Sequence, residues 1–111
     1  MRPPTIKIMG SPRRTQVLAL LALLGESYPT EIARLLDGRL YSIQTIVDSL
    51  ECEGILASRL MGRVRLVSLD PRYFAFRQLK DLLLRIAEAE PQLRKAAERR
   101  RSRPRRKGKA L

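Results

Sequence analysis

A length of 111 residues is typical of one domain, and a hydrophobic content of 44% is enough for a single buried core. The chain has no histidine and one cysteine, Cys52, which excludes an internal disulfide, a zinc site of cysteine and histidine, and an imidazole base. The sequence also contains no glycine-rich phosphate loop, no paired catalytic carboxylates and no nucleophile beside a base. We therefore expect neither an enzyme nor a bound metal or cofactor.

The net charge is +12, and most of it lies near the C-terminus. Residues 94–109 contain ten basic residues and one acidic residue, which gives this stretch a charge of +9. Because like charges repel and few apolar residues are available for burial, we expect residues 91–111 to form a basic, largely disordered tail that attracts polyanions. The pattern allows a helix to resume from Gln92 to Arg100 before that tail begins.

Arg13 and Arg14 precede an apolar run from Val17 to Leu24, which has the appearance of a secretory signal. The residues that follow, Gly25–Pro29, contain no cleavage site of small residues. The run of eight residues is also shorter than the roughly 18–20 that cross a bilayer. We therefore expect a cytoplasmic protein with no membrane partner.

Glycine and proline divide the chain into its first predicted elements, after an N-terminal arm of residues 1–10. The sequence predicts a helix from Pro12 to Leu24, with Ser11 as its N-cap and Gly25 at its end. Apolar residues nearly encircle the second half of this helix, so we expect it to be central. A shorter second helix is predicted from Pro29 to Leu36.

A third helix is predicted from Tyr41 to Glu53. Apolar residues from Ile43 to Leu50 recur at the spacing of a helix that packs on one side. The opposite face carries short polar side chains, namely Ser42, Gln44, Thr45, Asp48 and Ser49.

Beyond Gly54 the apolar period changes to two, which predicts a β-hairpin with its turn at Gly62. The alternation predicts that three arginines face away from the core, namely Arg59, Arg63 and Arg65. The residues predicted to face the core are Leu60, Val64 and Leu66. Such arginines either neutralise phosphates or prevent the hairpin edge from pairing with other strands.

Asp70 and Pro71 predict the start of a long fourth helix that continues to Ala89. It carries more apolar residues than one core-facing stripe requires, and we expect the surplus to form a homodimer interface. The alternative is that these residues are simply exposed or pack on the N-terminal segment Ile6–Met9. The predicted interface residues are Phe74, Phe76, Leu79, Leu82, Leu83 and Ile86.

The predicted elements are three helices, a hairpin with a basic tip and a long C-terminal helix. This order predicts a mainly α fold with a small β-hairpin. More specifically, it predicts a winged helix-turn-helix domain over residues 11–90. Thr30–Leu36 (TEIARLL), Ser42–Leu56 (SIQTIVDSLECEGIL) and Gly62–Leu66 (GRVRL) resemble the ArsR/MarR-type bacterial transcriptional regulators. The resemblance covers about residues 12–75. It implies a homodimer that places the third helix in the major groove of DNA and the hairpin, or wing, against the backbone or minor groove.

Carried over by position, the resemblance assigns base reading to Ser42, Gln44 and Thr45, and wing contacts to Arg63 and Arg65. The chain departs from the family at Arg39, where a small capping residue is common, and it lacks the cysteine pair of metal-sensing members.

The residues themselves support the same role, because an amide such as that of Gln44 can pair with adenine in the major groove. A solvated helix face is the alternative reading of these positions. We expect a nucleoid-associated bacterial regulator whose partner is double-stranded DNA, or else an RNA- or ribosome-associated basic protein, or an antitoxin-like partner of an enzyme. The predicted DNA-binding residues are Arg39, Tyr41, Ser42, Gln44, Thr45, Arg59, Arg63 and Arg65.

Overall fold

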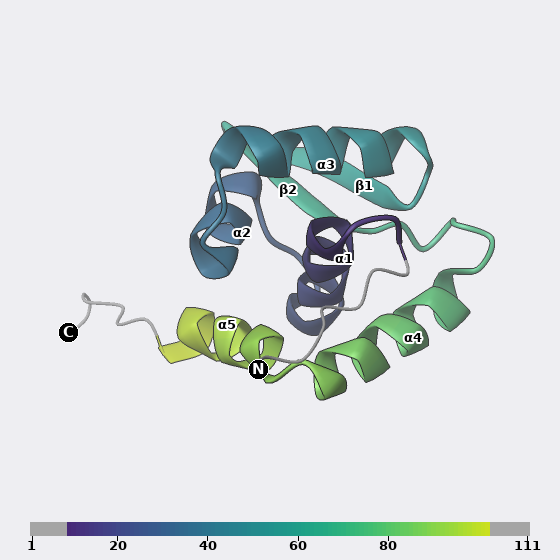
Figure 1. Ribbon diagram of the computed structural model, residues 1–111. Helices are drawn as coiled ribbons and strands as arrows, with labels where there is room; N and C mark the ends of the chain where they lie inside the picture. The colour runs from purple at the N-terminus through teal and green to yellow at the C-terminus, as the bar shows by residue number, and fades with distance from the viewer. Residues whose placement is uncertain (1–8, 103–111) are drawn as a thin grey trace.

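The structure, a computed structural model, describes residues 9–102 (Figure 1). This part of the chain is mainly helical with one antiparallel hairpin, in agreement with the predicted class. None of its helices has the length and apolar content needed to cross a membrane. The elements are α1 (Pro12–Leu24), α2 (Pro29–Leu36), α3 (Leu40–Cys52), β1 (Leu56–Met61), β2 (Val64–Leu69), α4 (Phe76–Ala89) and α5 (Pro91–Ser102).

Helix α1 lies at the centre of the molecule, with α3 and the hairpin on one side of it and α4 and α5 on the other (Figure 1). Its bounds match the predicted ones. The Ser11 hydroxyl accepts a hydrogen bond from the backbone N–H of Arg14, and Gly25 ends the helix with a φ of 86°. Every residue from Val17 to Ala22 is buried, which confirms the prediction of a central helix.

Helices α2 and α3 are joined by a tight turn at Asp37, whose φ is 54°, and Gly38. Helix α2 has the predicted bounds, and α3 begins one residue earlier than predicted and ends at Cys52. The apolar face of α3 is buried as its spacing predicts, through Ile43, Val47 and Leu50.

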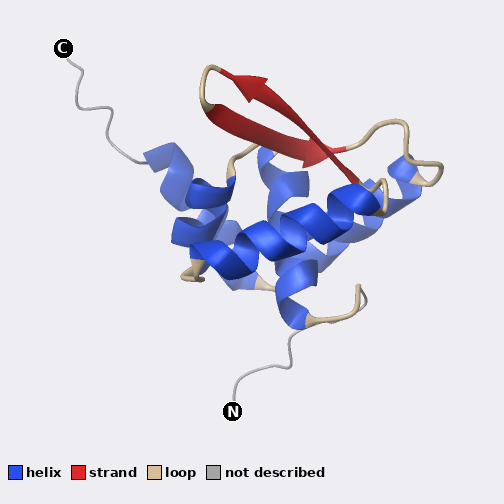
Figure 2. Cartoon of the chain, turned by 90° about the horizontal axis from the view of Figure 1, so that it is seen from above, coloured by secondary structure: helices blue, strands red, loops and turns tan. Residues whose placement is uncertain are grey.

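The hairpin lies along one side of the helices, with its turn at the free end (Figure 2). Ser27 extends the sheet by one bridge, in which its N–H and carbonyl oxygen exchange hydrogen bonds with Val67. The bonds are 3.0 Å from Ser27 N to Val67 O and 2.7 Å from Val67 N to Ser27 O.

The predicted orientation of the hairpin side chains is right for β1 and wrong for β2. In β1, Leu60 lies on the same face as the buried Leu56, and Arg59 lies on the opposite face. Leu60 pairs with Arg65 across the strands, so Arg65 shares the face of Leu60 and lies opposite to Arg59. The residues of β2 that reach the core are Val67 and Leu69, and the predicted core residues Leu60 and Val64 are exposed. The reason is that the helices cover only the end of the hairpin distant from the turn.

Helix α4 begins at Phe76, five residues later than predicted. The Asp70 carboxylate accepts a hydrogen bond from the backbone N–H of Arg72, at 2.9 Å, and pairs with the Arg72 guanidinium, which makes a local turn instead of a helix cap. These interactions with Arg72 hold the pKa of Asp70 below its ordinary value. Further turns then connect Asp70 with Tyr73 and Tyr73 with Phe76.

Three of the six predicted dimer residues, Leu79, Leu83 and Ile86, are buried in the core of the chain itself. They are therefore not available as a surface for a partner, and this part of the prediction is wrong. Phe74 is 91% exposed, Leu82 is also exposed, and Phe76 is half-buried. The apolar stripe of α4 is used mainly to cover α1.

Residues 91–102 form α5. The prediction of a largely disordered tail is therefore wrong for these residues, and the helix that the sequence allowed from Gln92 to Arg100 is present. Leu93, Ala96 and Ala97 bury an apolar stripe against the core. The Arg99 guanidinium donates hydrogen bonds to the carbonyl oxygens of Arg34 and Leu35 near the end of α2. Residues 103–111 of the predicted tail and residues 1–8 of the predicted arm lie outside the described residues.

Replacement of the fully buried Leu93 by alanine tests whether α5 belongs to the fold. We expect Leu93→Ala to lower the free energy of unfolding by about 2–4 kcal/mol, because a leucine removed from a packed core leaves a cavity. Urea denaturation of the full chain measures the change, and Arg94→Ala, at the exposed neighbouring position, is the matched control. Equal stability of the two variants would contradict the packing of α5.

Candidate nucleic-acid interface

The outward face of α3 is open along its first three turns. Ser42, Gln44 and Thr45 are exposed, and so is Tyr41, at 79%. The Thr45 hydroxyl donates to the carbonyl oxygen of Tyr41, 3.0 Å away in the same helix. Within residues 9–102, the side chains of Ser42 and Gln44 make no hydrogen bond. No other part of the described chain covers this face.

Helix α3 carries two carboxylates, Asp48 and Glu51, and a third, Glu53, at its C-cap; each of them is paired with an arginine. The Arg65 guanidinium lies 2.9 Å from Asp48 Oδ1 and 2.6 Å from Glu51 Oε1. Arg14 pairs with Glu53 at 3.0 Å. Two cations from neighbouring elements therefore offset two of these three negative charges, and a net charge of −1 remains.

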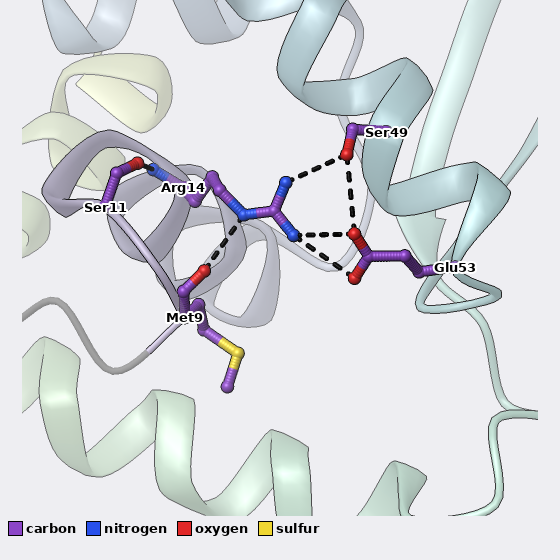
Figure 3. A network of polar contacts seen from close by, with 5 residues as sticks. All are labelled: Met9, Ser11, Arg14, Ser49 and Glu53. Carbon is purple, nitrogen blue, oxygen red and sulfur yellow. Dashed lines mark hydrogen bonds and ion pairs between the residues drawn. The ribbon is translucent and has the colours of Figure 1, made fainter.

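Arg14 attaches the N-terminal end of α1 to the last turn of α3 (Figure 3). Its Nε donates to the carbonyl oxygen of Met9 at 2.9 Å, and its Nη1 donates to the Ser49 hydroxyl at 3.0 Å. Its Nη2 donates to both carboxylate oxygens of Glu53, at 3.2 and 3.0 Å. Because one guanidinium contacts three groups, it determines how the end of α3 lies on α1.

Glu51 joins α3 to both strands of the hairpin. It accepts hydrogen bonds from Arg65 on β2, at 2.6 Å, and from the Ser58 hydroxyl on β1, at 2.8 Å. The hydrogen bond from Arg65, followed by that from Ser58, lowers the pKa of Glu51 from its ordinary value of 4.5. The carboxylate thus fixes the hairpin beside the exposed face of α3.

A groove of about 350 Å³ lies between the start of α2, α3 and the hairpin. Gln44 lines it from α3, and Arg63, Val64 and Arg65 line it from the hairpin. The α2 side consists of residues 28–30, which sequence reasoning missed. No pattern in the sequence could have identified them, because their role depends on the position of the hairpin relative to α2.

The four predicted DNA-binding arginines have different surroundings. Arg39, at the N-cap of α3, and Arg63, at the hairpin turn, are exposed and have no side-chain partner in the described part of the chain. Arg59 pairs with Glu26 at 3.3 Å, and Arg65 pairs with Asp48 and Glu51. The structure thus leaves two of the four cations uncompensated.

The described residues contain no group of three histidine, cysteine, aspartate or glutamate side chains placed to hold a metal ion. No family model matches the chain, and no curated protein is found to be similar to it.

The lowered pKa of Glu51 predicts a dependence of stability on pH. A carboxyl whose pKa is lower in the folded state contributes stability above its unfolded pKa, and this contribution is lost as the pH falls through the folded pKa. We therefore expect the stability difference between the parent chain and Glu51→Gln to shrink as the pH falls below 4.5. Urea unfolding at several pH values measures it, and a difference that stays constant between about pH 7 and about pH 2 would contradict the interaction.

Arg14→Met tests the network of Figure 3 while keeping the apolar stem of the side chain. We expect a loss of about 1–2 kcal/mol in the free energy of unfolding, because the Arg14 side chain is only 22% exposed and its guanidinium contacts three groups. Arg85→Met, which removes an exposed pair with Glu88, is the control and should change stability little. Thermal unfolding of the two variants measures the difference, and equal values would show that the Arg14 network adds no stability.

Proposed function

We propose that the chain is a DNA-binding transcriptional regulator with a winged helix-turn-helix fold, in which α3 enters the major groove and the hairpin is the wing. The observation that carries the proposal is the exposed polar face of α3, with an uncompensated Arg39 at its start and an uncompensated Arg63 beside it. The order of helices and hairpin and the resemblance to ArsR/MarR-type regulators support it further.

The ion pairs of α3 matter for this proposal because DNA carries a dense negative charge. Asp48 and Glu51, together with Glu53 at the C-cap, alone would give α3 and its cap a charge of −3, which phosphates would repel. Arg14 and Arg65 offset two of these three charges from outside the helix and leave a net charge of −1. The polar face can then approach a duplex, and Arg39 and Arg63 remain free to contact phosphates.

Gln44 and Thr45 are the proposed base-reading residues. A glutamine amide can both accept from and donate to an adenine edge, and a threonine offers a hydroxyl and a methyl group. Each good contact of this kind discriminates between bases by about 1–3 kcal/mol. Tyr41 and Ser42 are exposed nearer the start of the helix, and we propose that they contact the sugar-phosphate backbone of the DNA.

A homodimer is part of the proposal, with Phe74 and Leu82 at its interface. Both side chains are exposed apolar residues at or near α4, which lies across α1 from α3 (Figure 1). In a two-fold dimer the two α3 helices would read half-sites about 34 Å apart.

A second candidate, an RNA- or ribosome-associated protein, is favoured by a different observation. The charge of +9 lies in residues 94–109, and Arg94, Lys95 and Arg99 are exposed on α5, which lies across α1 from α3 (Figure 1). In that case binding would depend on the C-terminal basic residues and not on α3.

Selection of duplexes from a random DNA pool, followed by anisotropy measurements at stated salt concentrations, tests the proposal. We expect Gln44→Ala and Thr45→Ala to relax the base preference at one position each, by about 1–3 kcal/mol. Gln78→Ala, which removes an exposed glutamine from α4, is the matched control and should leave the preference unchanged. The second candidate would be favoured if the selection enriches no duplex and the chain binds single-stranded RNA as tightly as it binds duplex DNA.

A further inference from the structure

The free end of the hairpin is apolar. Leu60 is 74% exposed, Met61 is 55% exposed and Val64 is 43% exposed. Met61 pairs with Val64 on one face of the hairpin, and Leu60 lies on the other face. Leu60 shares the face of the core residues Leu56, Val67 and Leu69, whereas Met61 and Val64 lie on the opposite face. The apolar surface therefore extends past the core contact and continues around the end of the hairpin.

The turn itself makes this end narrow. Gly62 has a φ of 64°, as a two-residue hairpin turn requires, and a side chain at Gly62 would meet no atom within 4 Å. The next residue, Arg63, is exposed and makes no ion pair with any described residue. The end of the hairpin thus combines a thin apolar edge with one free positive charge.

The exposed apolar residues at the end of the hairpin neither pack in the core nor protect the edge of the sheet from pairing with other strands. Leu56, Val67 and Leu69 make the core contacts of the hairpin. An edge that avoids association usually carries charged residues or proline. The arginines of the hairpin can have that role, but the exposed leucine, methionine and valine beside them cannot. The end of the hairpin is also small, because two residues form the turn, and it cannot supply the area of a stable protein interface.

We infer that the end of the hairpin is an apolar wedge, which enters the minor groove of DNA and unstacks a base step with Leu60 and Met61. This inference rests on the proposed function. A minor groove has sugars and base edges between two rows of phosphates, which complements an apolar edge that carries one arginine. Proteins that insert apolar side chains in this way bend the duplex by roughly 20–90°.

The position of the hairpin relative to α3 supports the same occupant. Arg63 and Val64 line one groove together with Gln44, so the wedge and the proposed reading helix face the same side of the molecule. Glu51 holds the hairpin to α3 through Arg65 and Ser58, which gives the wedge a fixed support. A duplex that contacts α3 therefore meets the end of the hairpin at an adjoining groove.

The test uses the full chain and a selected duplex of about 30 base pairs with a fluorophore at each end. We expect binding to shorten the end-to-end distance measured by energy transfer and to raise the fluorescence of 2-aminopurine at one base step. The double variant Leu60→Ser and Met61→Ser should bind with the same base preference and lose both signals. Because both residues are exposed, its free energy of unfolding should equal that of the parent chain.

Two control variants separate the apolar contribution from charge. The exchange Leu60→Met with Met61→Leu keeps the apolar edge and should keep both signals. Arg63→Ala should weaken binding uniformly and lower the slope of the salt dependence by about one, with the bend retained at saturation. A bound duplex that stays straight, or a serine variant that bends it as the parent does, would overturn the wedge and leave the proposed function intact. If the chain binds no duplex at all, both fail.

Discussion

Burial of Ile43, Val47 and Leu50 determines which side of α3 faces outward, and the candidate interface depends on this orientation. Hydrophobic packing fixes the rotation of the helix, and arginines of neighbouring elements then compensate its carboxylates. The sequence of α3 with its C-cap residue Glu53 has three negative charges and, taken alone, is a poor match for a polyanion. Arg14 and Arg65 reduce this charge from −3 to −1, and two free arginines, Arg39 and Arg63, lie beside the polar face.

The first three helices could be predicted closely. Local signals mark both ends of α1, at Ser11 and Gly25, and the start of α2, at Pro29. The orientation of the β2 side chains could not be predicted, because both faces of this strand carry apolar residues. Only the position of the helices determines which of the two faces is buried. Helix α5 was expected only as a possible helix from Gln92 to Arg100, because the high charge of residues 94–109 outweighed a short apolar stripe that Leu93 begins.

The candidate site was predictable in part. A short polar face opposite an apolar stripe is visible in sequence, and Gln44 and Thr45 are exposed as expected. The pairing of Arg65 with two carboxylates of α3 joins residues 14 and 17 positions apart, and the network of Arg14 and Glu53 joins residues 39 apart. Such pairs depend on tertiary structure, so counting arginines overestimates the charge that is free to bind.

The central claim is that a nucleic acid contacts α3 and the hairpin turn, and not merely the basic C-terminal residues. Amide chemical shifts of the isotope-labelled full chain, followed during titration with a selected duplex, test this most directly. The account predicts that the largest shifts occur in residues 39–45 and 62–64, with little change in the exposed residues of α4. Shifts confined to residues 94–111 would contradict it.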